Sequence, residues 1–152
     1  GIGIGMKVLY SSRHRKPELD KKGAKKTTLG ALLKTSDAIS LNVIQSKDTD
    51  GMIGKKQLVL MKQGTYFINT AGARPIDWGA MLDAVKRGKI NLLFHNTHGL
   101  DPAVIRTVLP LKNVQFYPGI AFRTHESMTA MFEIFTRNIE QFAKGKPQNV
   151  AI

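Results

Sequence analysis

Short apolar runs rich in strand-forming residues alternate along this chain with helical segments, and this alternation constrains the fold more than any other feature. The runs are Met6 to Ser11, Ala38 to Ile44, Thr65 to Thr70, Ile90 to His95 and Val114 to Tyr117. Parallel strands need crossover helices between them, so the rhythm predicts an α/β fold with a mostly parallel sheet and helices on both faces. We expect Ala38 to Ile44 and Ile90 to His95 to be buried on both faces, because they are continuously apolar.

Helical periodicity fills the intervals between these runs. A short helix is expected within Arg13 to Lys22, a second carrying Leu29, Leu32 and Leu33 on one face, a third closed by Leu58 to Met61, and a fourth from Trp78 to Val85 that Gly88 ends. The longest runs from about Glu126 to Ala143. One stripe of it carries apolar side chains, namely Met128, Met131, Phe135, Ile139 and Phe142, and Gly145 and Pro147 end it.

Length and composition predict one globular domain spanning residues 1–152. The chain has no Cys, which excludes disulfides and thiolate metal sites, and no apolar run approaches the ~18 residues that span a bilayer. It has no secretory signal pattern either. We therefore expect a cytoplasmic protein that does not insert in membranes.

Basic residues outnumber acidic ones, 23 to 11, for a formal net charge of +12. A local cluster contributes to this excess: Arg13, His14, Arg15, Lys16, Lys21, Lys22, Lys25 and Lys26. A positive field of this size favours an acidic partner, and a solvated lysine-rich surface is the alternative.

Five stretches in order resemble the cofactor domain of D-2-hydroxyacid dehydrogenases of the glyoxylate and hydroxypyruvate reductase type. They are GMKVLYSSRHRKPE (5–18), TLGALLKTSDAISLNVIQSKDTDGMIGKKQLVLMKQGTYFINTA (28–71), ARPIDWGAMLDAVKRGKI (73–90), KNVQFYPGIAFRTHES (112–127) and NIEQFAKGKPQNV (138–150). The resemblance implies a Rossmann-like domain that binds NAD or NADP, and it agrees with the strand and helix rhythm.

One departure from the family concerns the phosphate-binding turn. The family opens with a strand, a G-x-G-x-x-G turn and a helix, whereas GIGIGMKV leads directly into the family's second strand. We therefore expect an incomplete dinucleotide-binding domain that lacks the first βα unit and the catalytic domain, and that binds NAD or NADP weakly or has lost this binding. Gly1 and Gly3 are the candidate remnant of the turn, and a flexible glycine-rich terminus is the alternative.

The resemblance also implies cofactor-binding positions. At the end of the family's second strand, NAD enzymes place an acid, whereas this chain has Ser12, Arg13 and Arg15, which favour the extra phosphate of NADP unless they form only a basic surface loop. The remaining cofactor-binding positions follow the later strands: Asn42, Val43, Thr49, Asn69, Thr70, Ala71 and Asn96.

The family transfers a hydride between nicotinamide and the substrate's C2, assisted by a His, an acid that orients it and an Arg that pairs with the substrate carboxylate. Gly72 occupies the family's Arg position, and Arg74, two residues on, is the local substitute. Asp101 occupies the position of the acid. Gly119 occupies the position of the His, and glycine has no side chain that could transfer a proton. His98 is the weak candidate to replace it.

Two functions remain open at this stage. One is the cofactor domain of an oxidoreductase that has lost most of its catalytic residues. The other is a pseudoenzyme, in which the fold serves as a basic binding module for RNA, a ribonucleoprotein or another acidic partner. His95, His98 and Asp101 look like a metal set, but the two His, at i and i+3, lack a defined third ligand, so we expect no metal site.

Overall fold

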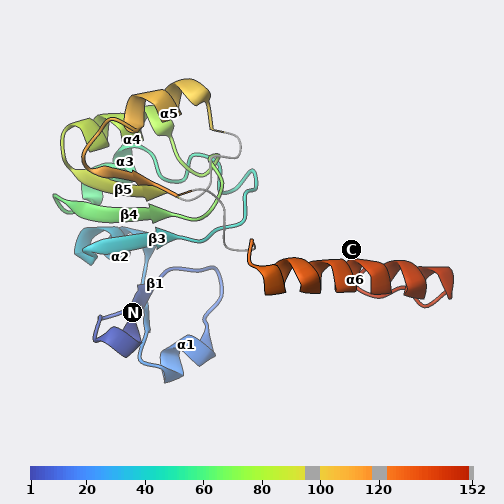
Figure 1. Cartoon of the computed structure of the whole chain (residues 1–152). Coiled ribbons are helices and arrows are strands. Elements are labelled where there is room, and N and C mark those ends of the chain that lie inside the picture. The colour runs from blue at the N-terminus through green and yellow to red at the C-terminus, as the bar shows by residue number, and fades with distance from the viewer. Residues whose placement is uncertain (95–99, 118–122, 151–152) are drawn as a thin grey trace. The chain divides into compact units, whose positions relative to one another are not determined.

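A computed structural model of the chain describes residues 1–94, 100–117 and 123–150 (Figure 1). Residues 1–118 and 119–152 are two separate compact units. The first contains a 3-10 turn (Ile2–Ile4) and the elements β1 (Leu9–Tyr10), α1 (Pro17–Lys21), β2 (Lys25–Lys26), α2 (Leu29–Thr35), β3 (Ala38–Leu41), α3 (Lys55–Leu60), β4 (Thr65–Asn69), α4 (Trp78–Lys86), β5 (Ile90–Phe94), α5 (Pro102–Val108) and β6 (Val114–Phe116). The second contains α6 (His125–Ala143).

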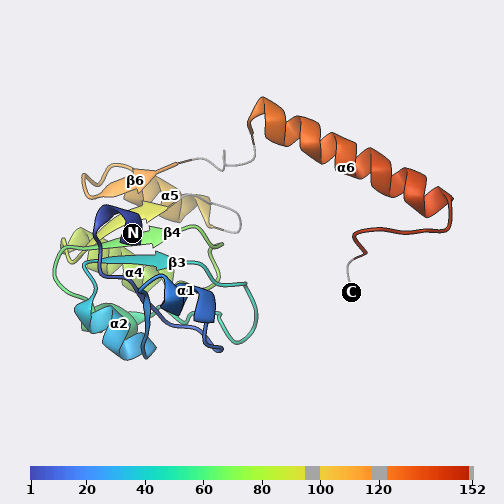
Figure 2. The same cartoon turned by 90° about the horizontal axis from the view of Figure 1, so that it is seen from below.

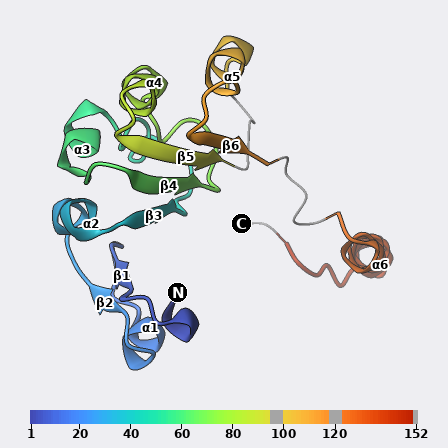
Figure 3. The same cartoon turned by 60° about the vertical axis from the view of Figure 1, so that its left-hand side comes forward.

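Four strands form one parallel sheet in the order β3-β4-β5-β6. Alternate residues of each strand point into the core, where Phe67 and Phe94 are fully buried. On that side α2 packs against α3, α3 against α4 and α4 against α5 (Figure 3). From β3 to β6, each new strand joins the same edge of the sheet. Since such crossovers are right-handed, their helices lie on one face. The mostly parallel α/β architecture is thereby confirmed.

The opposite face of this sheet is open in the described residues. Ala38 and Ser40 of β3 are exposed, and Tyr66 in β4 is 62% exposed. The expectation that Ala38 to Ile44 is buried on both faces was therefore wrong. The same expectation for Ile90 to His95 was also wrong over its described part, because Asn91 and Leu93 are only half-buried. The physical reason is that the described helices α2 to α5 lie along the other face of β3 to β6 (Figure 3).

A second, two-stranded parallel sheet joins β1 to β2, with Leu9 opposite Lys25. In the usual doubly wound order 3-2-1-4-5-6, β2 and β1 correspond to strands 3 and 2, and β3 corresponds to strand 4. None of the described strands takes the position between β1 and β3.

Local signals in the sequence explain where the helices begin and end. The side chains of Thr28 and Asp77 accept hydrogen bonds from backbone N–H groups in the first turns of α2 and α4, respectively. Gly88 adopts a φ of 68° after α4, a left-handed conformation that glycine reaches without strain. The predicted helix ends at Gly88 and Gly145 are confirmed.

The second unit is the long helix α6 with a short tail (Figure 2). Thr124 caps its start, as its hydroxyl accepts from the Ser127 N–H at 3.2 Å. Its predicted apolar stripe is largely exposed within the unit, with Phe135 63% and Phe142 76% exposed. The helix is thus amphipathic, and its apolar face has no partner within the described part of its own unit.

Candidate functional site

The carboxyl ends of β3 and β4 lie side by side, with Leu41 opposite Asn69. Thr70 follows β4, and its hydroxyl contacts both Asn42 Oδ1, at 2.7 Å, and the Leu41 carbonyl, at 3.2 Å. Ligands of open α/β sheets bind outside the carboxyl ends of the strands. This edge is therefore the candidate site, and it carries the predicted positions Asn42, Val43, Asn69, Thr70 and Ala71.

Asn69 is the buried polar residue of this edge. Its Nδ2 donates to the Gly72 carbonyl at 3.3 Å, whereas its Oδ1 is buried without a hydrogen-bond partner in the described residues. A buried acceptor left unpaired costs about 1–3 kcal/mol. A donor group of a bound ligand would satisfy it.

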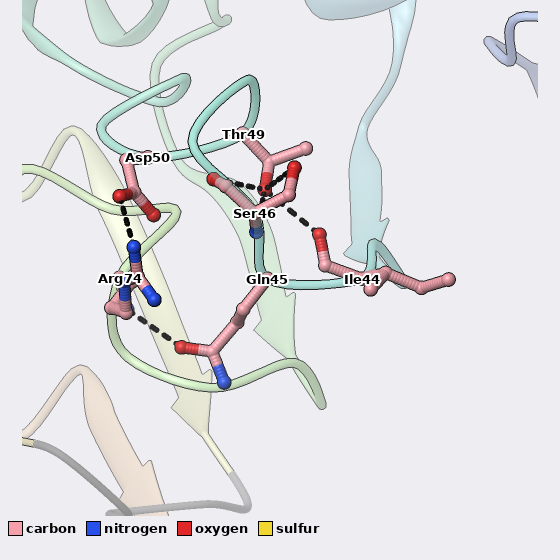
Figure 4. Close-up of polar contacts among 6 residues, drawn as sticks. All are labelled: Ile44, Gln45, Ser46, Thr49, Asp50 and Arg74. Carbon is pink, nitrogen blue, oxygen red and sulfur yellow. Dashed lines mark hydrogen bonds and ion pairs between the residues drawn. The ribbon is translucent and has the colours of Figure 1, made fainter. Parts of the chain in front are cut away.

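The loop after β3 folds around Thr49 (Figure 4). Thr49 Oγ1 donates to the Ile44 carbonyl at 2.8 Å and accepts from the Ser46 N–H at 2.9 Å. These bonds occupy the hydroxyl within its own turn. Thr49, predicted to bind cofactor, thus holds the shape of the loop.

Gly72 is buried beneath the side chain of Gln45. A β-carbon added at residue 72 would collide with the Gln45 amide group, which itself accepts from the Arg74 N–H at 3.4 Å (Figure 4). At the position that the resemblance assigns to the carboxylate-binding Arg, a side chain would therefore have to displace the amide end of the exposed Gln45.

Arg74, the predicted substitute, directs its guanidinium to Asp50, with 2.5 Å between Nη2 and Oδ2 (Figure 4). Backbone bonds reinforce the same junction, since the Gly51 N–H donates to the Arg74 carbonyl at 2.9 Å. The side chain thus ties two loops together, and its charge is matched by a carboxylate of the protein. That Arg74 is the displaced carboxylate clamp stays a prediction.

Carboxylates also engage the arginines after β1. Arg13 pairs with Asp48 at 2.6 Å, and Arg15 pairs with Asp20 at 2.5 Å. The hydrogen bond from Arg15, followed by that from the Tyr10 hydroxyl, lowers the pKa of Asp20 below its usual value, and Asp20 in turn raises the pKa of Arg15. The Ser12 hydroxyl donates to the His14 carbonyl at 2.5 Å.

The remaining predicted positions lie elsewhere or outside the described residues. Gly3 lies in the 3-10 turn before β1, and Gly1 is the residue that precedes this turn as its N-cap. Asp101 caps α5, accepting from the Ala103 N–H at 2.8 Å. Four further predicted positions lie outside the described residues: His95, Asn96, His98 and Gly119.

In residues 1–94, 100–117 and 123–150, no three His, Cys, Asp or Glu side chains group around a metal-sized space. Over the same ranges, no helix combines the length and apolar character needed to cross a membrane.

The parallel order and the polar carboxyl edge define a dinucleotide-binding domain of the doubly wound class. The chain belongs to the D-isomer specific 2-hydroxyacid dehydrogenase family, since the family's NAD binding domain matches residues 2–121.

Known proteins agree with this assignment. The chain is 40% identical to a glyoxylate reductase of Thermococcus litoralis over 150 residues, which is 97% of this chain and 45% of that protein. A hydroxypyruvate reductase of Blautia hydrogenotrophica is 29% identical over 97% of this chain and 46% of its own length. A D-lactate dehydrogenase of Aquifex aeolicus, solved with NAD and lactic acid, matches with a TM-score of 0.86 and 34% identity over 95% of this chain and 48% of its own. The chain thus spans about half the length of the relatives it matches.

Sequence reasoning missed Gln45, Asp48 and Asp50. Each lies in the loop after β3 and acts on a residue at least 24 positions away along the chain. One feature of the sequence could have identified Gln45 in advance. The resemblance assigns an Arg to position 72, where this chain has glycine, and Gln45 is a polar residue in the loop that follows the neighbouring strand.

Proposed function

We propose that this chain is the cofactor-binding domain of an oxidoreductase that uses a nicotinamide dinucleotide to reduce a small 2-oxo acid, such as glyoxylate or hydroxypyruvate. The proposal rests on the family match and on the activities for which two of its relatives are named. The bound dinucleotide would lie along the carboxyl edge of β3 and β4.

The residues of this edge fit a dinucleotide. The unpaired Asn69 Oδ1 would accept from an amide or hydroxyl donor, and the exposed Asn42 and Thr70 supply further polar groups. We propose NAD(H) rather than NADP(H), because Arg13 and Arg15 already hold carboxylates.

We further propose that this domain is catalytically degenerate, and the glycine at position 72, to which the resemblance assigns the carboxylate-binding Arg, carries that proposal. The substrate's carboxylate needs a cation placed for bidentate pairing. Gly72 offers none, and Arg74 is held by Asp50. Asp101 remains as an exposed carboxylate in the acid position, engaged in capping α5.

Calorimetric titration of the chain with NADH and with NADPH tests the cofactor assignment. NADH should bind, and Asn69→Ala should weaken it about 2- to 10-fold, the loss of one hydrogen bond. Tyr66→Ala, at the amino end of the same strand, is the matched control and should bind as the parent does. Failure of folded protein to bind NADH at any concentration would refute the cofactor role.

An activity assay tests the degeneracy separately. With NADH present, glyoxylate and hydroxypyruvate should not accelerate its oxidation. Turnover that disappears in Arg74→Ala would contradict the proposal, because it would make Arg74 the carboxylate clamp.

A basic binding module for RNA or a ribonucleoprotein is the second candidate function. The observation that favours it is the exposure of the lysines in and around α1 and β2, namely Lys16, Lys21, Lys22, Lys25 and Lys26. A cluster of exposed positive charges attracts phosphates, and this attraction requires no catalytic group. This role requires neither NADH nor a 2-oxo acid.

A further inference from the structure

We propose that the groove between α3 and α4 binds a small organic acid, whose carboxylate pairs with Arg87 and Lys89 while its apolar body lies along the two helices. The groove has a volume of about 280 Å³, just below the range of about 300–1,000 Å³ found for drug-sized ligands, so it fits a smaller molecule. The described residues that line it lie in α3, in α4 or in the short turns after these helices.

The groove exists because α4 faces α3 with short side chains. The two helices pack side by side on one face of the sheet (Figure 3). Ala80 and Ala84, four residues apart, share the face of α4 that lines the groove, and each contributes only a methyl group. Near the ends of the helices, Lys89 Nζ donates to the Val59 carbonyl at 3.2 Å and joins the two sides.

The lining of the groove is apolar along both helices. Leu58 of α3 and Ala84 of α4 are buried residues of the core, whereas Val59 is 66% exposed although it is apolar. A ligand with an apolar body would cover Val59 and remove this surface from water, which is favourable. The groove therefore suits a hydrocarbon chain or ring.

Positive charge dominates the polar part of the lining. Lys55, Arg87 and Lys89 line the groove, against the carboxylate of Asp83. Arg87 Nη2 lies 3.7 Å from Asp83 Oδ2, and both side chains are more than 65% exposed, so this ion pair is weak. Lys89 donates to one backbone carbonyl and keeps further N–H donors. Both cations can thus bind a carboxylate, and this charge selects an acid over a neutral or basic molecule.

The proposed site is distinct from the carboxyl edge of the sheet. Arg87 and Lys89 come just before β5, and so lie toward the amino end of that strand. The dinucleotides of doubly wound folds bind at the opposite, carboxyl ends of the strands. An acid in the groove would therefore leave the proposed dinucleotide position free.

Titration of the whole chain with octanoate, followed by methyl NMR, tests the proposal. The methyl signals of Leu58, Val59 and Ala80 should shift together, with a dissociation constant on the order of millimolar, as expected for so small a ligand. Octanol has the same chain without the charge, and acetate has the charge without the chain. Each should bind at least about fivefold more weakly than octanoate.

Matched variants separate a specific site from the general positive charge of the protein. Arg87→Gln should weaken octanoate binding about 2- to 5-fold, the loss of one exposed ion pair. Lys86→Gln removes the same charge one residue away, outside the lining, and should bind as the parent does. Ala80→Leu should fill the groove and abolish the shifts, with folding checked by thermal melting.

Unshifted signals in the folded parent, or shifts confined to the exposed apolar residues of α6, would overturn the proposal. So would equal weakening by Arg87→Gln and Lys86→Gln, or octanol binding as tight as that of octanoate. NADH has no part in these readouts, so their outcome is independent of the proposed enzyme role.

Discussion

The side-chain amide of Gln45 lies against Gly72, in the space that a β-carbon at residue 72 would need. Gln45 follows β3 and Gly72 follows β4, so the contact joins the two loops at the carboxyl edge of the sheet. In this arrangement Gln45 occupies space that is open because residue 72 is glycine.

Gly72→Arg alone should therefore destabilise the protein slightly. The atoms displaced are the amide end of Gln45, an exposed and flexible side chain, so the cost should be small, about 0.5 kcal/mol in the free energy of unfolding. Gln45→Gly combined with Gly72→Arg should recover most of this loss, as measured by urea denaturation. Gly30→Ala in α2, where a β-carbon meets nothing within 4 Å, is the control and should not destabilise. Equal stability of Gly72→Arg and the double variant would show that Gln45 does not fill the space in solution.

Asp48→Asn should improve binding of NADPH relative to NADH. It releases Arg13 from its ion pair and removes a negative charge near the expected 2′-phosphate. Because both partners are more than 70% exposed, the gain should be small, about 2- to 5-fold in the ratio of dissociation constants. Asp83→Asn, which breaks a comparable exposed pair with Arg87 on α4, is the control. An unchanged ratio in Asp48→Asn would mean that Arg13 does not contact the cofactor.

Asp20 should give stability a pH dependence. Arg15 and Tyr10 lower its pKa in the folded state, so its contribution is present above the pKa of an unfolded Asp, about 4, and is lost as the pH falls through the lower folded value. The melting temperature of Asp20→Asn should thus lie below that of the parent at pH 7, and the difference should shrink below about pH 4. A difference that stays constant from pH 7 to pH 2 would contradict the assignment.

If the basic cluster binds polyanions, affinity for RNA should fall steeply with salt, with a log–log slope of about 0.7–0.9 per phosphate contacted. Lys25→Glu with Lys26→Glu should weaken binding more than Arg137→Glu with Lys144→Glu in and after α6. Filter binding at several salt concentrations measures both. Equal effects of the two pairs would identify a diffuse positive coat, and no retention at low salt would remove the second candidate function.

Much of the fold could be predicted from the sequence because it depends on local pattern. Apolar runs such as Thr65 to Thr70 became strands, and Gly88 ended its helix as expected. Whether the second face of a strand is buried is not local, since it depends on a helix packed there. That is why Ala38 and Ser40 were expected to be buried and are exposed.

The candidate site divides in the same way. The sequence by itself determined the family, the position of Asn42 and Thr70 after parallel strands, and the glycine at residue 72. Only the tertiary structure decided that Gln45 fills the space above Gly72 and that Asp50 holds Arg74. The physical reason is that a side chain forms hydrogen bonds and ion pairs with the groups that the fold brings within about 3 Å of it. Residues far apart in the sequence come that close only when the sheet has formed.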